Sequence, residues 1–197
     1  MARRAWLAFA RIADIGRPAL DATRRTLCGP EHRRYARFAS GRRAREFLAG
    51  RWLLARSRRA WRGRGGAYSI SHSGGWVACA LSERGVPGVD IEPMVKRDFA
   101  TLGAWAFPDD WDERGDAPRA FYGRWTRYEA RLKGGPGPTY RERTWFVDGV
   151  AISVRLPWLE LLHVGAPRRW RRAWGFVRRH GPLDRPAIVK TGNFERR

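Results

Sequence analysis

Helical and strand patterns alternate along this chain of 197 residues, and their order constrains the fold more than any other feature. Residues 41–59 predict a helix with one stripe, formed by Ala44, Phe47, Leu48, Arg51, Trp52 and Ala55. Three short strand patterns follow, separated by Gly/Ser and Gly-Val-Pro turns, at residues 68–73, 76–82 and 88–92.

The same order returns in the second part of the chain. Residues 119–133 predict another helix, whose apolar stripe consists of Phe121, Trp125, Tyr128 and Leu132. The Gly/Pro-rich run at 134–138 ends this helix. The repeated order predicts an α+β protein of two halves, at residues 1–93 and 94–197.

A hairpin is expected near the end of the second half. Asp148-Gly149 is a two-residue turn signal, and strand patterns flank it at 145–147 and 150–156. Residues 158–164 fit a further strand.

Asp90 and Glu92 are the strongest local signal for chemistry. Alternate side chains of a strand share a face, so both carboxylates point one way while Val89 and Ile91 point the other. Solvated acids on a strand edge are the ordinary explanation. Acidic residues are scarce in this basic chain, however, and hard oxygen ligands of this kind suit Mg²⁺.

Glu129 and Lys133 add an acid and a base on one face of the second helix, because they are four residues apart. Such a pair is ordinarily a helix-stabilising contact. Together with Asp90 and Glu92, it predicts three carboxylates around a cation and a lysine placed for a phosphate oxygen.

Two further stretches are candidates for anion binding. Ser71 and His72 lie at a strand end before Gly74, where hydroxyl, imidazole and backbone N–H groups can meet phosphate; a hydrogen-bonded turn is the alternative. Basic side chains on or before the first helix form either a solvated face or a bidentate phosphate site, and they are Arg42, Arg43, Arg45 and Arg51.

The net charge of +21 points to an acidic or phosphate-rich partner. Only Lys96, Lys133 and Lys190 are lysines, so arginine supplies the rest of the 40 basic residues, and codon bias is an equal explanation for that excess. The interleaved Arg/Trp run at 168–174 also suits stacking on nucleic acid.

The two cysteines, Cys28 and Cys79, form no C-x-x-C pattern and no disulfide framework, which favours a cytoplasmic location. The N-terminal run at 2–10 begins like a signal peptide, but Arg11 and Asp14 interrupt it. No segment approaches the length of a membrane span.

Taken in order, these pieces resemble the Sfp-type 4'-phosphopantetheinyl transferases. The similarity rests on residues 45–51, 69–73 and 88–92, and on Trp125-Thr126 through Glu129-Ala130 to Lys133. It covers roughly residues 40–135. Two positions depart from the family pattern: Tyr128 replaces a usual lysine, and the loop 61–67 lacks the family's basic-Pro element.

The resemblance implies two ferredoxin-like α+β halves related by a pseudo-twofold, in a monomer that binds coenzyme A and Mg²⁺ between them. By motif match, Asp90, Glu92 and Glu129 would be the metal ligands, and Asp90, Glu129 and Lys133 the catalytic residues. The coenzyme A contacts would come from Arg45, Arg51, Ser71, His72 and Lys133.

The implied reaction moves the phosphopantetheine arm of coenzyme A to a serine of an acidic acyl carrier protein and releases 3',5'-ADP. Carriers of fatty-acid-like, polyketide or peptide biosynthesis are the expected partners. Two alternatives are a basic nucleic-acid-binding protein and a coenzyme A-binding paralogue without turnover. Convergence of the three carboxylates in a cleft would favour the enzyme, because clustered carboxylates repel a nucleic-acid backbone.

Overall fold

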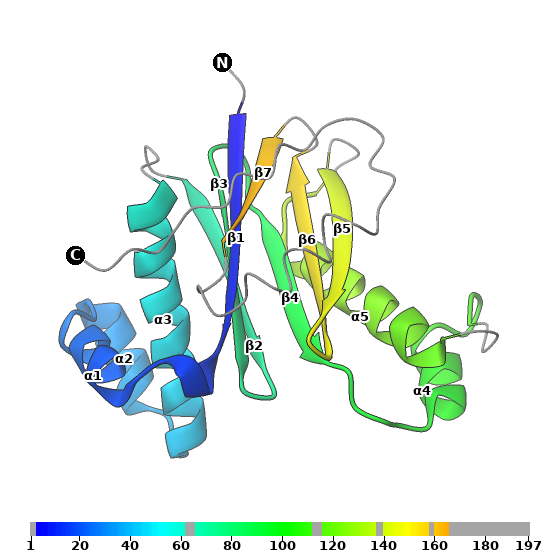
Figure 1. Cartoon of the computed structure of the whole chain (residues 1–197), viewed down its shortest axis with the longest axis horizontal. Coiled ribbons are helices and arrows are strands. Elements are labelled where there is room, and N and C mark those ends of the chain that lie inside the picture. The colour runs from blue at the N-terminus through cyan, green and yellow to red at the C-terminus, as the bar shows by residue number, and fades with distance from the viewer. Residues whose placement is uncertain (1–2, 62–65, 112–115, 137–139, 158–159, 166–197) are drawn as a thin grey trace.

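The computed structural model describes residues 3–61, 66–111, 116–136, 140–157 and 160–165, which form an α+β fold (Figure 1). In chain order the elements are β1 (Arg3–Arg11), the 3-10 turn η1 (Ile12–Asp14), α1 (Arg17–Arg25), α2 (Gly29–Ala36), α3 (Gly41–Trp61), β2 (Ala67–Ser73), β3 (Trp76–Ser82), β4 (Gly88–Pro93), α4 (Phe99–Ala106), α5 (Ala117–Lys133), β5 (Tyr140–Val147), β6 (Val150–Pro157) and β7 (Glu160–Gly165). No helix in these ranges is long and apolar enough to cross a membrane.

The strands form two sheets, with the orders β2-β3-β1-β7 and β4-β6-β5. All neighbouring pairs are antiparallel except β1 and β7, which run parallel. Strand β4 precedes residue 94 but pairs with β6, and β1 at the N-terminus pairs with β7. Each sheet therefore combines strands from both sides of the expected boundary.

The two sheets pack face to face between layers of helices (Figure 1). Alternation along the strands builds these layers, because successive side chains point to opposite faces. In β1, Leu7 and Phe9 contribute to the core shared with the second sheet, whereas Trp6 and Ala8 pack in the core beneath α3. The core beneath α5 is smaller and mainly aromatic.

The predicted hairpin is confirmed. Strands β5 and β6 are joined at Asp148 and Gly149, whose φ angles are 47° and 74°. Positive φ at both central residues is what a tight turn of this kind requires, and Asp-Gly tolerates it. The helices at 41–59 and 119–133 and the strands at 68–73, 76–82 and 88–92 are also confirmed, with small shifts at their ends.

Three parts of the prediction need correction. Strand β1 was missed, as were α1, α2 and α4. The stripe expected on α3 is only partly buried, since Ala55 is exposed while Leu53 and Leu54 are in the core. The apolar stripe predicted on α5 is buried only at its start: Phe121 is 7% exposed, but Tyr128 and Leu132 are 48% and 65% exposed.

Candidate functional site

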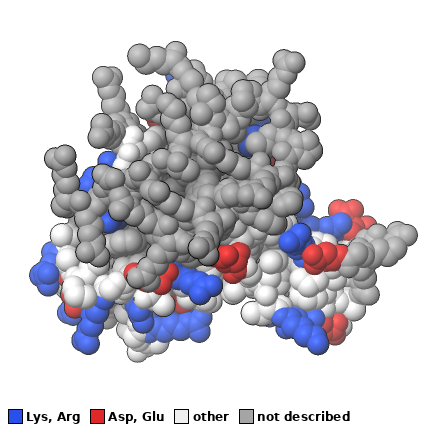
Figure 2. Space-filling view, viewed as in Figure 1, with Lys and Arg blue, Asp and Glu red and all other residues white. Residues whose placement is uncertain are grey.

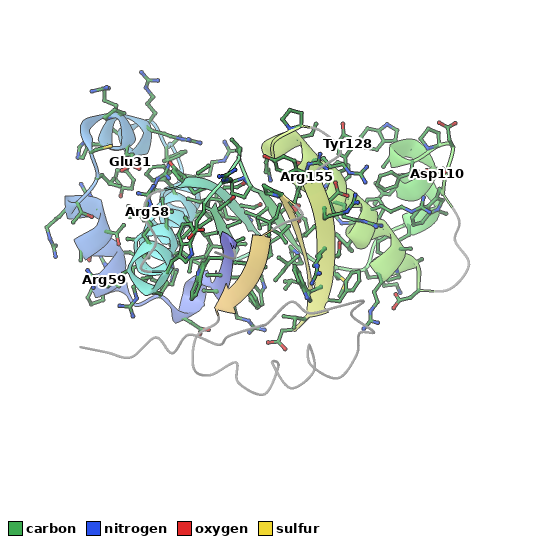
Figure 3. All side chains as sticks on the ribbon, turned by 90° about the horizontal axis from the view of Figure 1, so that it is seen from above. Glu31, Arg58, Arg59, Asp110, Tyr128 and Arg155 are labelled. Atoms are coloured by element: carbon green, nitrogen blue, oxygen red, sulfur yellow. The ribbon has the colours of Figure 1, made fainter. Side chains whose placement is uncertain are left out.

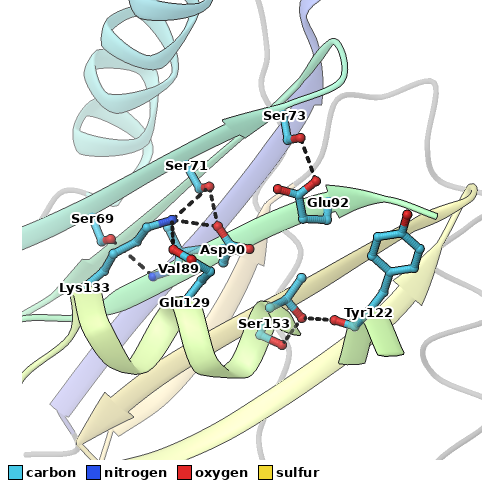
Figure 4. A network of polar contacts seen from close by, with 11 residues as sticks. Ser69, Ser71, Ser73, Val89, Asp90, Glu92, Tyr122, Glu129, Lys133 and Ser153 are labelled. Atoms are coloured by element: carbon cyan, nitrogen blue, oxygen red, sulfur yellow. Dashed lines mark hydrogen bonds and ion pairs between the residues drawn. The ribbon is translucent and has the colours of Figure 1, made fainter. Parts of the chain in front are cut away.

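A ladder of serine side chains joins the edges of the two sheets, where β2 lies beside β4 (Figure 4). Ser69 Oγ accepts a hydrogen bond from the backbone N–H of Val89 at 3.2 Å. Ser71 Oγ donates to Asp90 Oδ1 at 2.7 Å, and Ser73 Oγ donates to Glu92 Oε2 at 2.7 Å. The two acids of the strand are therefore held by hydroxyl groups from the opposite sheet.

Lys133 reaches this ladder from the last turn of α5 (Figure 4). Its Nζ lies 2.6 Å from Asp90 Oδ1 and 3.8 Å from Glu129 Oε2. The same nitrogen donates to Ser71 Oγ at 3.3 Å, which is possible because the Ser71 hydroxyl hydrogen is directed at Asp90. One ammonium group thus connects α5, β4 and β2.

The last turn of α5 approaches β4 so closely because Gly88 has no side chain. A Cβ atom at Gly88 would overlap the carbonyl oxygen of Ala130 and press against the backbone of Gly134. A backbone hydrogen bond from Gly135 N to Val86 O, at 2.8 Å, fixes the chain just after the helix. The glycine at the start of β4 therefore determines how far Lys133 and Glu129 reach over Asp90.

Burial makes a negative charge on the carboxylates of β4 costly in free energy. Asp90 is 2% exposed, and its Oδ2 atom is buried with no hydrogen-bond partner among the described residues. Desolvation raises the pKa of Glu92 above its ordinary value; the Ser73 hydrogen bond opposes the shift, and the Asp90 charge adds to it. Both acids gain from a nearby positive charge, because a charge removed from water is costly unless it is paired.

The donor set fits a hard cation in part. The orphaned Oδ2 of Asp90 and the carboxylate of Glu129 are oxygen donors of the type that Mg²⁺ prefers. Nevertheless, no three acidic, histidine or cysteine side chains of the described residues are grouped closely enough to hold a metal ion. The expected three-carboxylate site is therefore not formed here, since the Lys133 ammonium lies between Asp90 and Glu129 and Glu92 bonds to Ser73.

A pocket of about 450 Å³ opens at the N-terminal end of α3. Its lining combines basic, acidic and small residues: Ile12, Ala13, Gly41, Arg42, Arg45, Glu46 and Gly75. Arg45 contacts the carbonyl oxygen of Ile12 at 3.5 Å. His72 Nδ1 lies 3.5 Å from Glu46 Oε2, so the histidine predicted to bind phosphate is attached to the wall of this pocket.

Arg51 lies apart from the other predicted anion ligands. Its Nε pairs with Glu31 Oε1 at 3.0 Å, and its guanidinium packs over the rings of Phe47 and Tyr68. The side chain is 16% exposed. In this arrangement Arg51 attaches α2 to α3, which is a structural contact.

Sequence reasoning missed a second line of hydroxyl groups, under α5. Thr126 Oγ1 donates to the Tyr122 carbonyl at 2.8 Å, so its contact with Ser153 Oγ at 2.7 Å must be donated by Ser153. Thr144 then donates to Ser153 at 2.7 Å. Ser153 is the register partner of Asp90 where β6 pairs with β4. This pairing places Ser153 beside the site, and the sequence pattern did not reveal it.

The chain matches no protein-family model, and no curated protein matches it. At the site, Lys133 and Glu129 from α5 meet Asp90 from β4.

Proposed function

We propose that the protein transfers the 4'-phosphopantetheine arm of coenzyme A to a serine of an acyl carrier protein. The observation that carries the proposal is the meeting of Lys133 and Glu129 from α5 with Asp90 from β4, across 43 residues of sequence between Lys133 and Asp90. The pocket with Arg45 and Arg42 supports it, because bidentate guanidinium groups suit a phosphate.

The reaction needs positioning and charge neutralisation more than covalent help. The hydroxyl oxygen of the carrier serine attacks the phosphorus that bears the pantetheine arm, and the bond from that phosphorus to the bridging oxygen of the pyrophosphate breaks. The electron pair leaves with 3',5'-ADP. Glu129 takes the serine proton directly or through water.

Lys133 is proposed to neutralise the pyrophosphate. This role requires its ammonium to exchange some of its contact with Asp90 for phosphate oxygens, and its 3.8 Å contact with Glu129 shows that it already spans both acids. Arg45 and His72 would hold the 3'-phosphate near the pocket at α3, and Ser71 would contribute its hydroxyl group. Arg51 is left out of this set because it pairs with Glu31.

Mg²⁺ is proposed as the cofactor. Asp90 and Glu129 would hold it once Lys133 moves from between them, and Glu92 would join them by giving up its bond with Ser73. When bound, the ion would neutralise charge that grows on the leaving oxygen. Ser71 and Ser73 orient the two carboxylates of β4 by hydrogen bonds. Asp90 Oδ2, which has no hydrogen-bond partner in the described part of the chain, supports this assignment.

The finer architecture is part of the same proposal. One helix, α3 or α5, lies on the outer face of each sheet, and this likeness supports two ferredoxin-like halves related by a pseudo-twofold in a cytoplasmic monomer (Figure 1).

The direct test incubates the protein with coenzyme A, Mg²⁺ and an apo acyl carrier protein, and follows the carrier by mass spectrometry. We expect one phosphopantetheine to be added to the carrier serine and 3',5'-ADP to appear in equal amount. Asp90→Asn should reduce the rate at least about 100-fold, while Asp21→Asn on the exposed surface of α1 should leave it unchanged. Absence of transfer to every carrier tried, with coenzyme A bound or not, would refute the proposal.

A further inference from the structure

The second half of α5 exposes an apolar stripe beside the candidate site. Trp125, Tyr128 and Leu132 are spaced by three and four residues, which places them on one helix face. Tyr128 is 48% and Leu132 65% exposed. The rings continue outward from the core, since Phe121 stacks on Trp125 at 6.2 Å and Trp125 lies 6.3 Å from Tyr128.

The neighbours of this stripe differ sharply on its two sides. Each helical residue turns by about 100°, so Glu129 and Lys133 border the stripe on one side, one position after Tyr128 and Leu132. Arg127 and Arg131 border it on the other, one position before. The apolar face therefore separates the candidate site from a row of arginines.

The row consists of Arg124, Arg127 and Arg131, and the contacts of these arginines neutralise little of its positive charge. Glu142 is a single carboxylate shared between Arg131 and Arg155. Arg127 donates to the Gly123 carbonyl at 2.9 Å and Arg124 to the Asp110 carbonyl, which are uncharged groups. Figure 3 shows Tyr128 and Arg155 on the same side of the molecule, away from Arg58 and Arg59.

We propose that the stripe Trp125–Tyr128–Leu132 is the docking surface for the carrier protein, which would contribute an amphipathic helix with an apolar face and acidic residues along one flank. The inference rests on the proposed function. Acidic residues of the partner would face Arg124, Arg127 and Arg131, and this contact would place the partner's serine on the opposite side of the stripe, beside Glu129. An apolar centre with a charged rim is also the usual anatomy of a specific interface.

The test uses the full chain and a fluorescein-labelled apo acyl carrier protein, with binding followed by anisotropy and transfer by mass spectrometry. Leu132→Asp should weaken carrier binding and raise the KM for the carrier at least 10-fold, with kcat and calorimetric binding of coenzyme A unchanged. The matched control is Val95→Asp, at a residue 46% exposed in the segment before α4, and it should stay within twofold of the unaltered protein.

A second pair of variants tests the basic flank. Arg127→Glu should weaken carrier binding at 0.1 M salt and reduce its dependence on salt, because one steering charge is reversed. Arg17→Glu, on the exposed surface of α1, should change neither property by more than twofold.

The outcomes separate the docking surface from the activity. Transfer by Leu132→Asp with an unchanged KM would overturn the surface and leave the function standing, whereas no transfer by the unaltered protein would overturn the function. A marked loss of thermal stability in Leu132→Asp would mean that the chain covers the stripe itself. Conversion of a dimer to a monomer by this variant would assign the stripe to a second copy. Either result would also overturn the proposal.

Discussion

Helices α3 and α5 occupy equivalent layers but relate to their sheets differently. α3 buries residues along most of its length, and they are Glu46, Phe47, Leu48, Ala49, Gly50, Leu53, Leu54, Ser57 and Trp61. α5 buries only Phe121, Tyr122, Gly123, Thr126 and Ala130, and none in its last three residues. The difference teaches that α3 mainly stabilises the fold, whereas the end of α5 holds the charged side chains of the candidate site between core and solvent.

The contacts beneath the two helices differ in chemistry as well. The core under α3 is mainly aliphatic and aromatic, with Leu53 and Leu54 against Val77 and Leu81. Under α5, a directed chain of hydroxyls runs from Thr144 through Ser153 and Thr126 to the Tyr122 carbonyl. Hydrogen bonds are directional, so this polar contact fixes the rotation of α5 about its axis. On the face that Figure 2 shows, basic side chains lie at both ends of the described surface.

The largest expected effect comes from truncating one leucine on each helix. Leu53→Ala should reduce the free energy of unfolding by about 3 kcal/mol, because it leaves a cavity in the core at a residue 3% exposed. Leu132→Ala should change it by less than about 0.5 kcal/mol. Urea unfolding of both variants measures the contrast. Equal losses would mean that α5 is buried as fully as α3.

A second test compares the glycines at which the helices meet the sheets. Gly88→Ala should cost about 2–3 kcal/mol and displace the end of α5, because the new methyl group meets backbone at Ala130. At Gly50 of α3 an added Cβ lies 3.0 Å from a side-chain methyl of Ile70, which can shift, and the better helix propensity of alanine offsets the strain. Gly50→Ala should therefore stay within about 1 kcal/mol of the unaltered protein in the same unfolding experiment. A harmless Gly88→Ala would refute the close backbone approach.

Sequence patterns predicted the fold where the signal is local. Asp148-Gly149 specifies a turn by its own backbone preferences, and the alternation in β4 specifies which residues share a face. Strand β1 was missed because both its faces are buried, which gives a continuous apolar run without alternation. The short helices α1 and α2 have basic, weakly apolar sequences, so their tertiary contacts decide them.

The residues of the candidate site were predicted from the sequence, but the contacts between them were not. Asp90, Glu129 and Lys133 were selected from spacing and resemblance, and the structure brings them together. Spacing could not show that Lys133 would lie on Asp90, because this depends on the approach permitted by Gly88. The alternate serines of β2 were a readable period-two signal, but their partners are in another sheet. The apolar stripe of α5 was predicted, but its exposure was not, because periodicity measures amphipathicity and not what covers the apolar face.

The third prediction compares the ion pairs that hold the two helices. Lys133→Met should reduce the free energy of unfolding by about 2 kcal/mol, because it leaves the buried carboxylate of Asp90 without its cation. Arg51→Met on α3 breaks the pair of Arg51 with Glu31, a carboxylate that is more exposed than Asp90. It should cost about 1 kcal/mol.

Rescue provides the control for this comparison. Adding Asp90→Asn to Lys133→Met should recover most of the loss, since the unpaired charge is then gone. If the double variant is no more stable than Lys133→Met, the cost comes from lost packing of the lysine stem and not from the charge of Asp90.

The smallest effect is expected at Glu142, which anchors the end of α5 through Arg131 and Arg155. Its carboxylate accepts from Arg131 at 2.6 and 2.8 Å and from Arg155 at 2.6 Å. Burial opposes ionisation, but these hydrogen bonds outweigh it and lower the pKa of Glu142 below its ordinary value of 4.5. Folding therefore favours the ionised carboxylate.

The sign of the pH dependence follows from that lowered pKa. The ionised Glu142 contributes its full stabilisation above pH 4.5 and loses it as the pH falls through the lower, folded-state pKa. Glu142→Gln should thus reduce the free energy of unfolding by about 1 kcal/mol at pH 7 and by progressively less below pH 4.5. Asp109→Asn, at an exposed residue, serves as the matched control and should show no such difference. Denaturant midpoints measured from pH 7 to pH 3 would contradict the ionic anchor if the Glu142→Gln loss were the same throughout, because a constant loss would come from shape alone.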